Sequence, residues 1–280
     1  MGGGYFGGRA RYQLFTAVKY TVYLLLCFNV YLFLQEELLA LDYTFVDGVE
    51  PGQLIQVFSA TIDTAAWVIL LLLFELETSI LDDSRIHGVV KWSIHGIRAM
   101  CSIAIVYAFT GYYAELVTLY NVSPMPGVDL CSLLDQSYSL LLDLDEYEPL
   151  NAVNCAAIGA DAFRFDEFAI VADGDVLQSA RWLGWTDVIN AAAWILVVIV
   201  LEIEVRLQLG GKLSDKIMQV NKLVKFGVYG ILFAAAAYWG YAGDFLDFWD
   251  AALWLFAFIF IELNVFEWQY ETSQQATAAA

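Results

Sequence analysis

Three apolar segments of the sequence carry acidic residues at matching positions. They read DTAAWVILLLLFELE, NAAAWILVVIVLEIE and DAALWLFAFIFIELN, and they start at Asp63, Asn190 and Asp250. Each segment has Asp or Asn four residues before a tryptophan, Glu eight residues after it, and Glu or Asn ten residues after it. Agreement at these four positions predicts an internal repeat.

The repeated acids could bind protons or a cation inside a membrane. A helix rises 1.5 Å per residue, so Glu75 would lie about 18 Å from Asp63. If Asp63 lies at the outer interface, Glu75 lies about two thirds of the way across a ~30 Å apolar core. Carboxylate and amide oxygens suit protons and hard cations. The predicted ion-binding layer therefore consists of Glu75, Glu77, Glu202, Glu204, Glu262 and Asn264.

Two other segments supply partners for these acids. KYTVY, from Lys19 to Tyr23, matches KFGVY, from Lys225 to Tyr229. We expect both tyrosines near the level of the glutamates and both lysines one turn nearer the cytoplasm. A structural role, in which each glutamate bonds a neighbouring helix, therefore stays open beside ion binding. In a third interpretation, the glutamates nearest the helix ends contact a cytoplasmic partner.

These positions require helices that span a membrane. The chain is 60% apolar with a net charge of −19, which excludes disorder and nucleic-acid binding. A span needs about 20 mostly apolar residues, and six such runs are present. The predicted spans are Phe15–Leu34, Ile62–Leu81, Ile94–Tyr113, Trp185–Leu207, Val224–Tyr241 and Phe245–Phe266.

The predicted fold is an all-α, six-span membrane protein made of three pseudo-repeated helical hairpins. The hairpins cover roughly residues 12–81, 91–208 and 221–270. By domain, we assign spans one to three to residues 1–114, an acidic outer loop domain to 115–184, spans four to six to 185–270 and a disordered tail to 271–280. The first apolar run is long enough to be a span and is not expected to be a cleaved signal peptide.

Basic residues set the expected orientation. Eleven of the thirteen Lys and Arg residues fall in the candidate inside segments, which are the termini, the alternate loops and the adjoining span ends on one side. Positive residues favour the cytoplasmic side, so we expect both termini in the cytoplasm and the long loop outside, in a bacterial inner membrane.

The outer loop holds two of the four cysteines. Cys131 and Cys155 lie 24 residues apart, and an oxidising compartment would join them as a disulfide. No histidine lies in that loop, which disfavours a metal site there, and a metal elsewhere is left open. We expect a short helix in VDLCSLLDQSYSLLLDL and a β-hairpin in FAIVADGDVLQ that turns at Asp173-Gly174-Asp175.

The remaining signals narrow the function. Trp67, Trp194 and Trp254 follow the outer Asp or Asn by one turn, so we expect them in the outer aromatic belt. Motifs of nucleotide-binding, hydrolase and zinc enzymes are absent from the sequence, so we expect neither catalysis nor a cofactor. The sequence predicts a protein that binds or translocates protons or small cations through its glutamate layer. The alternative is a membrane scaffold or accessory subunit, with a partner at the outer loop or a second copy of the chain.

Overall fold

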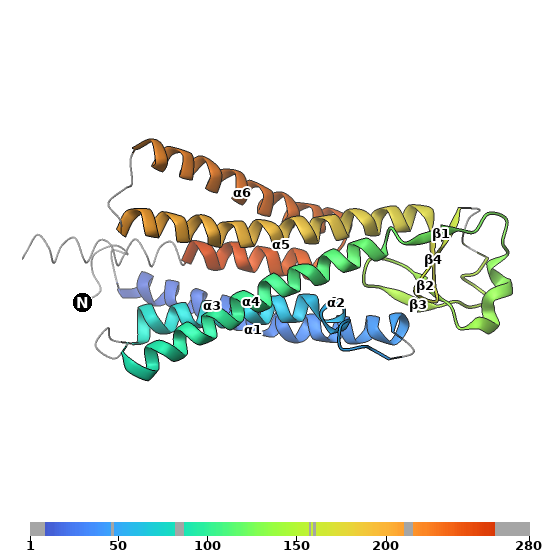
Figure 1. The fold of residues 1–280 in the computed structure, drawn as a ribbon, viewed down its shortest axis with the longest axis horizontal. Helices are drawn as coiled ribbons and strands as arrows, with labels where there is room; N and C mark the ends of the chain where they lie inside the picture. Colours follow the sequence, from blue (N-terminus) through green and yellow to red (C-terminus); the bar gives the residue numbers. More distant parts are fainter. Residues whose placement is uncertain are drawn as a thin grey trace, which may run out of the picture.

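The chain is mostly helical, with a small sheet at one end (Figure 1). The computed structural model describes residues 9–45, 48–81, 87–156, 158, 161–209 and 215–260, without the side chains of 9–12, 79–80, 204–209, 215–216 and 218. The labelled α-helices are α1 (Arg9–Thr44), α2 (Leu54–Val57), α3 (Ser59–Glu75), α4 (Gly88–Thr118), α5 (Gly174–Leu209) and α6 (Asp215–Ala242). A π-helical turn, η1 (Leu76–Ile80), extends α3, and residues 245–260 form a further helix.

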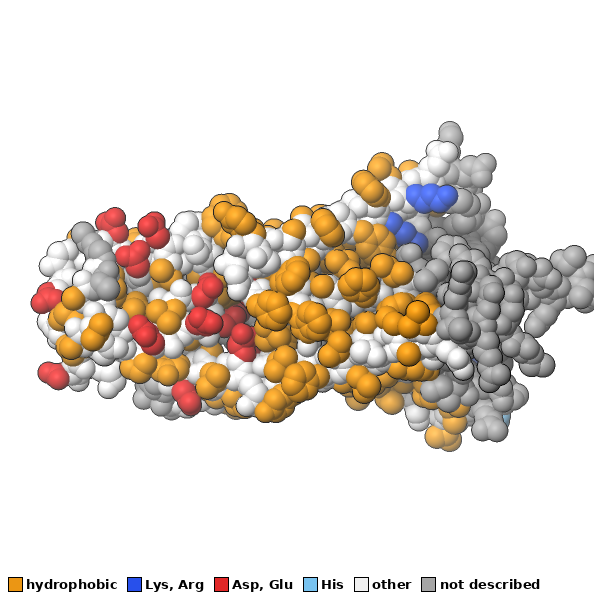
Figure 2. All heavy atoms as spheres, turned by 180° about the vertical axis from the view of Figure 1, so that it is seen from behind, with side chains coloured by type: hydrophobic (Ala, Val, Ile, Leu, Met, Phe, Trp, Pro, Cys, Tyr) orange, Lys and Arg blue, Asp and Glu red, His pale blue; other side chains and the backbone are white. Residues whose placement is uncertain are grey.

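Five of the described helices are long and apolar enough to cross a membrane, which indicates a multi-pass membrane protein. They are α1, α3 with η1, α4, α5 and α6, and they contain five of the predicted spans. The sixth predicted span is helical over residues 245–260, and its remainder lies outside the described residues. In Figure 2 hydrophobic side chains cover the helical part, and acidic side chains gather at the end that carries the sheet.

Three helices meet at the centre of the bundle through their tryptophans. The ring centroids of Trp67 on α3, Trp194 on α5 and Trp254 on helix 245–260 are 6.0 to 6.4 Å apart. Trp194 and Trp254 are only 8% and 7% exposed, so the predicted place in an aromatic belt is wrong. Packing against one another buries more aromatic surface than an interface does. It also lets the indoles of Trp67 and Trp254 bond Asp63 and Asp250 inside the bundle.

The other helices surround this centre. α1 packs against α3 and against helix 245–260, where Phe15 meets Phe260 at a centroid distance of 5.3 Å. α4 packs against α3 and α5, and α6 packs against α5. Tyr229 on α6 also reaches helix 245–260, with its ring 6.4 Å from that of Phe258.

A five-stranded sheet forms between α4 and α5. Its strands are β1 (Val122–Pro124), β2 (Ser139–Leu141), β3 (Tyr147–Pro149), β4 (Ala162–Phe165) and β5 (Ile170–Asp173), in the order β1-β4-β5-β2-β3. β2 and β5 pair in parallel and the other neighbours are antiparallel. The expected all-α class therefore holds for the helical bundle and is wrong for the loop. The expected helix in the loop is a 3₁₀ helix, η3 (Leu130–Gln136), which leads into β2.

The predicted hairpin at Asp173-Gly174-Asp175 is wrong, because this segment begins a helix. The side chain of Asp173 accepts a hydrogen bond of 3.0 Å from the backbone N–H of Asp175. That is the bond of a helix N-cap, and α5 starts at Gly174. β5 instead forms its antiparallel pair with β4, which precedes it in the chain.

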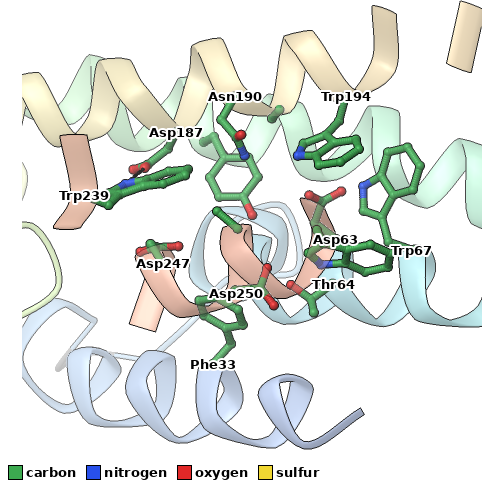
Figure 3. Close-up of a pocket in the computed structure, with 14 residues that line it drawn as sticks. Phe33, Asp63, Thr64, Trp67, Asp187, Asn190, Trp194, Trp239, Asp247 and Asp250 are labelled. Atoms are coloured by element: carbon green, nitrogen blue, oxygen red, sulfur yellow. Dashed lines mark hydrogen bonds between the residues drawn. The ribbon is translucent and has the colours of Figure 1, made fainter. Parts of the chain in front are cut away.

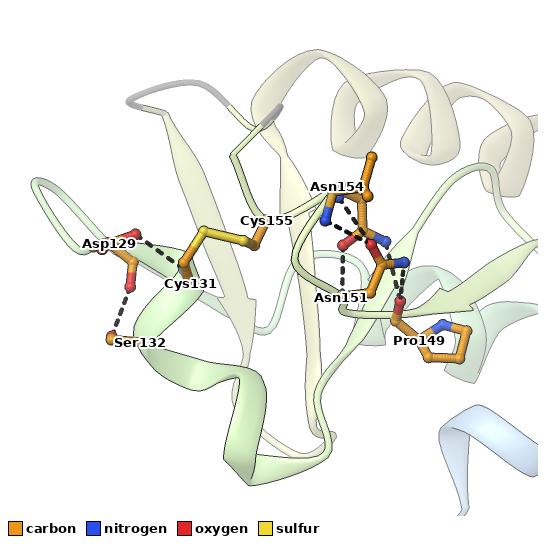
Figure 4. The surroundings of a disulfide bond; sticks show 8 residues. Asp129, Cys131, Ser132, Pro149, Asn151, Asn154 and Cys155 are labelled. Atoms are coloured by element: carbon orange, nitrogen blue, oxygen red, sulfur yellow. Dashed lines mark hydrogen bonds between the residues drawn. A yellow bond between two sulfur atoms is a disulfide. The ribbon is translucent and has the colours of Figure 1, made fainter.

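The predicted disulfide between Cys131 and Cys155 is confirmed, with a Cα–Cα distance of 5.0 Å (Figure 4). On one side, the Asp129 side chain accepts from the N–H of Cys131. On the other, Asn151 accepts from the N–H of Asn154 within a tight turn. The bond ties η3 to the turn between β3 and β4.

The sheet rests on the ends of the long helices. α1 has 36 residues and so a length of about 54 Å, well beyond a ~30 Å apolar core. Near its end Tyr43 stacks on Tyr147 of β3, with centroids 6.3 Å apart, and Phe45 meets Phe168 at 5.1 Å. The junction of sheet and bundle encloses the cavities described next.

Candidate functional site: an acid-lined chamber

A cavity of about 50 Å³ lies next to the three central tryptophans, on the side of the sheet (Figure 3). The three aligned tryptophans line it, together with the three aligned polar residues Asp63, Asn190 and Asp250. Asp187 and Asp247 also line it, one turn nearer the sheet on α5 and helix 245–260. A volume of this size holds a few water molecules or a small hydrated ion.

A second cavity of about 90 Å³ adjoins the first and reaches the sheet. The two cavities share Phe33, Tyr112, Asp187 and Asp247 in their walls, so we treat them as one acidic chamber. Eight carboxyl groups line it, and its described lining residues include no Lys, Arg or His. The eight are Glu36, Glu37, Asp63, Glu115, Asp145, Asp187, Asp247 and Asp250.

Neutral donors hold several of these carboxyl groups in place. The indole N–H of Trp239 donates to Asp187 over 3.1 Å, and the Asn29 amide donates to Asp250 over 2.7 Å. The backbone N–H of Ala60, at the start of α3, donates to Glu37 over 2.7 Å. Glu37 therefore caps α3 from another helix, where the helix dipole favours a negative charge. These bonds orient the acids and leave their charge uncompensated.

Two carboxyl groups meet where the sheet enters the chamber. Asp145, in the loop between β2 and β3, is hydrogen-bonded to Glu115 of α4, so the two groups share a proton. Burial, followed by the nearby charge of Asp244, raises the pKa of Asp145 to about 7. Burial also raises the pKa of Asp244, between α6 and helix 245–260. Burial therefore favours the protonated form of both acids at this end of the chamber.

The chamber ends at the tryptophans. Beyond them, buried apolar residues of α1, α3, α5 and α6 fill the bundle, among them Leu26, Leu71, Val197 and Leu232. Eight residues separate Trp67 from Glu75, or about 12 Å along α3. Within the described residues, the chamber and the predicted glutamate layer are thus separated by apolar packing.

In the predicted layer, Glu75 is buried and already paired. It is 3% exposed, and its Oε1 accepts from Lys19 Nζ at 2.7 Å and from the Tyr20 hydroxyl at 3.0 Å. The Tyr23 hydroxyl donates to Oε2 at 3.5 Å. The structure therefore brings together Glu75 and two of its four expected supporting residues, in the contacts that the structural interpretation expects.

The other residues of the predicted layer lie in different surroundings. Glu77 forms an ion pair with Arg98, and Glu202 is exposed on α5. Lys225 and Tyr229 are half-buried on α6. The side chain of Glu204 and the whole of Glu262 and Asn264 lie outside the described residues.

Sequence reasoning missed the chamber although two signals point to it. Asp187 and Asp247 each lie three residues before an aligned polar residue, a spacing that puts both on one helix face. Each first helix of a predicted hairpin also ends in an acid, including Glu36 and Glu115. Asp145 has no such signal, because only the fold of the loop carries it to the bundle.

Comparison with protein-family models, curated proteins and solved structures finds no match. The described residues contain no group of three or more His, Cys, Asp or Glu arranged to hold a metal ion. The chamber's own geometry therefore carries the functional argument.

Proposed function

We propose that the protein is an integral membrane protein that binds or translocates protons or small cations, and that these ions enter the acidic chamber. The observation that carries this is a chamber with eight carboxyl groups and no basic side chain among its described lining residues. Uncompensated carboxylates in a confined space repel one another, and each bound proton or cation relieves that repulsion. Rings of acidic side chains select cations in the same way.

The chamber supports ion binding better than the glutamate layer does. Glu75 and Glu77 each have a cationic partner, Lys19 and Arg98, which neutralises them without any bound ion. Within the part of the chain that the structure describes, the bonded partners of the chamber's carboxyl groups are neutral groups or one another. We therefore place the binding site about 18 Å from Glu75 along α3, at the level of Asp63.

We further propose the three-hairpin repeat as the architecture behind this site. The alignment that pairs Tyr23 with Tyr229 also pairs Phe33 with Trp239. If Arg98 of α4 is aligned with Lys19, Tyr112 falls at the same position as Phe33. All three aromatic residues line the inner cavity, beside the aligned tryptophans and the aligned Asp and Asn residues. Three aligned positions that converge on one cavity support a pseudo-threefold arrangement.

We place the chamber on the outer side of a bacterial inner membrane, with both termini in the cytoplasm. The described basic residues Lys91, Arg98, Lys222 and Lys225 lie at the helix ends away from the sheet, which the positive-inside rule assigns to the cytoplasm. The disulfide lies in the sheet, and an oxidising compartment outside the cytoplasm suits it.

The proposal is tested with purified protein in proteoliposomes, using a proton-sensitive dye and a panel of cations. Asp187→Asn/Asp247→Asn removes two charges from the wall shared by both cavities, and it should lower uptake at least tenfold. The matched control is Asp42→Asn/Asp135→Asn, which removes two charges from exposed positions outside the chamber and should leave uptake unchanged. Equal uptake by the chamber variant and wild type would overturn the proposal. If the wild-type protein shows neither uptake nor binding, the alternative function of a membrane scaffold or accessory subunit remains.

A further inference from the structure

The side-chain oxygen of Asn29, on α1, is buried and accepts no hydrogen bond from any residue that the structure describes. The residue is 0% exposed, and its Nδ2 donates to Asp250 over 2.7 Å. Its Oδ1 has no hydrogen-bond partner among the described residues. An unpaired buried acceptor costs about 1–3 kcal/mol, so it calls for a partner.

Asn29 lies beside the chamber, and no described partner of Oδ1 opposes a rotation of its amide. Asn29 lies one helical turn before Phe33, on the face of α1 that lines the inner cavity. Its partner Asp250 lines the same cavity, as do Asp63 and the buried Thr64. Figure 3 shows these three side chains close together. Asp63 and Asp250 lie close enough for their charges to interact.

We propose that Asn29, Asp63, Thr64 and Asp250 form a binding site for one monovalent hard cation of the sodium class. A carboxylate pair, an amide carbonyl and a hydroxyl offer only oxygen ligands, which hard cations prefer. When the cation binds, a flip of the Asn29 amide turns Oδ1 toward Asp250 and the ion. The site deepens the proposed function, on which it rests, by naming the ion class and its inner resting position.

The number of ligands in the site favours a monovalent ion over calcium. Calcium takes six to eight oxygen ligands, often from several carboxylates. Four side chains, without a third acidic ligand in the described surroundings, supply fewer ligands than calcium takes. The indoles of Trp67 and Trp254 bond Asp63 and Asp250, and they close the site on the side of the apolar packing.

The test is thermal unfolding of the detergent-solubilised full chain, titrated at constant ionic strength with sodium, potassium, lithium, magnesium or calcium against choline. Wild type should show saturable stabilisation by a monovalent ion, at far lower concentration than by either divalent ion. Asn29→Leu and Asp250→Asn should each raise the half-saturating concentration at least tenfold. Asn29→Asp adds an anionic ligand and should lower the half-saturating concentration. This variant keeps the test decisive if Asn29→Leu fails to fold. Asp42→Asn, at an exposed position on the same helix, should not change that concentration.

The outcomes separate the two proposals. Stability that responds to pH and to no monovalent cation would overturn this site and keep the chamber as a proton-binding space. An unchanged response in Asn29→Leu would also overturn it, because the free oxygen would then bond only water. A response to neither pH nor cations would overturn both proposals.

Discussion

The ion pair of Lys19 and Glu75 should be the strongest single polar contribution to the stability of the bundle. Both side chains are almost fully buried, at 6% and 3% exposed, and the Nζ–Oε1 distance is 2.7 Å. Lys19→Met leaves the glutamate charge buried, beside the hydroxyls of Tyr20 and Tyr23 and without its cation. Breaking a buried pair in this way costs about 3–5 kcal/mol of unfolding free energy.

The assay is a double-mutant cycle measured by equilibrium unfolding in mixed micelles. Glu75→Leu should cost a similar amount, because it leaves the lysine unpaired. The double variant Lys19→Met/Glu75→Leu should cost far less than the two single changes added together, because an apolar pair replaces both charges. Arg98→Met breaks the more exposed pair with Glu77, and should cost less than about 1 kcal/mol.

Additive single and double changes would refute this reasoning, because additivity means that the two side chains do not stabilise each other. The same variants also test the predicted glutamate layer. If Glu75 is paired for structure, Glu75→Gln should leave ion uptake through the chamber unchanged. A loss of uptake in Glu75→Gln with intact unfolding free energy would return the ion site to that layer.

Three further perturbations have defined outcomes. Gly111→Ala should destabilise the protein by about 1–3 kcal/mol in the same unfolding assay, because a Cβ there would lie 2.4 Å from a backbone oxygen of α2. The control Gly96→Ala, with open space around the new Cβ, should not lower the free energy of unfolding. Reducing the Cys131–Cys155 disulfide should cost the sheet about 3 kcal/mol and speed its proteolysis, since the closed loop spans 24 residues. The pKa of Asp145 is raised from 3.8 to about 7, so its contribution to the stability of the sheet on the bundle is present at acid pH and is lost as pH rises from about 4 to 7. Proteolysis of the sheet should therefore become faster over this pH range, and Asp145→Asn should remove that dependence on pH.

The helical bundle could be predicted because its signal is local. Runs of about 20 apolar residues specify spans whatever their neighbours, and five appear as long helices where the sequence placed them. The disulfide could be predicted from compartment and spacing alone. The sheet could not, since its central strands, β2 and β5, are short and pair in parallel across about thirty residues of chain. The Asp-Gly-Asp segment favours a turn by its local sequence, but here it starts α5, with Asp173 as the helix N-cap.

The candidate site could be predicted in part, because the repeat alignment found its residues and misassigned their depth. Asp63, Asn190 and Asp250 were expected to face the interface, and Trp67 and its equivalents the lipid belt. Spacing gives the level of a side chain along a helix and cannot give the direction it faces. The tryptophans turn inward because three of them can bury one another only at the centre, and they carry the adjacent aspartates with them.

The contrast between the two acidic levels explains how one fold can hold many carboxylates in a membrane. At the level of Glu75, a buried charge is compensated by a lysine, so the helices pack without any ion. At the level of Asp63 and Asp250, neutral donors bond the acids, and one amide oxygen is left over. Burying such charges uncompensated is costly, so this level is stable only when protons or cations supply the missing charge. Compensation within the protein favours a structural role, and compensation from the medium favours a functional one, which is why we propose the chamber as the place of ion binding.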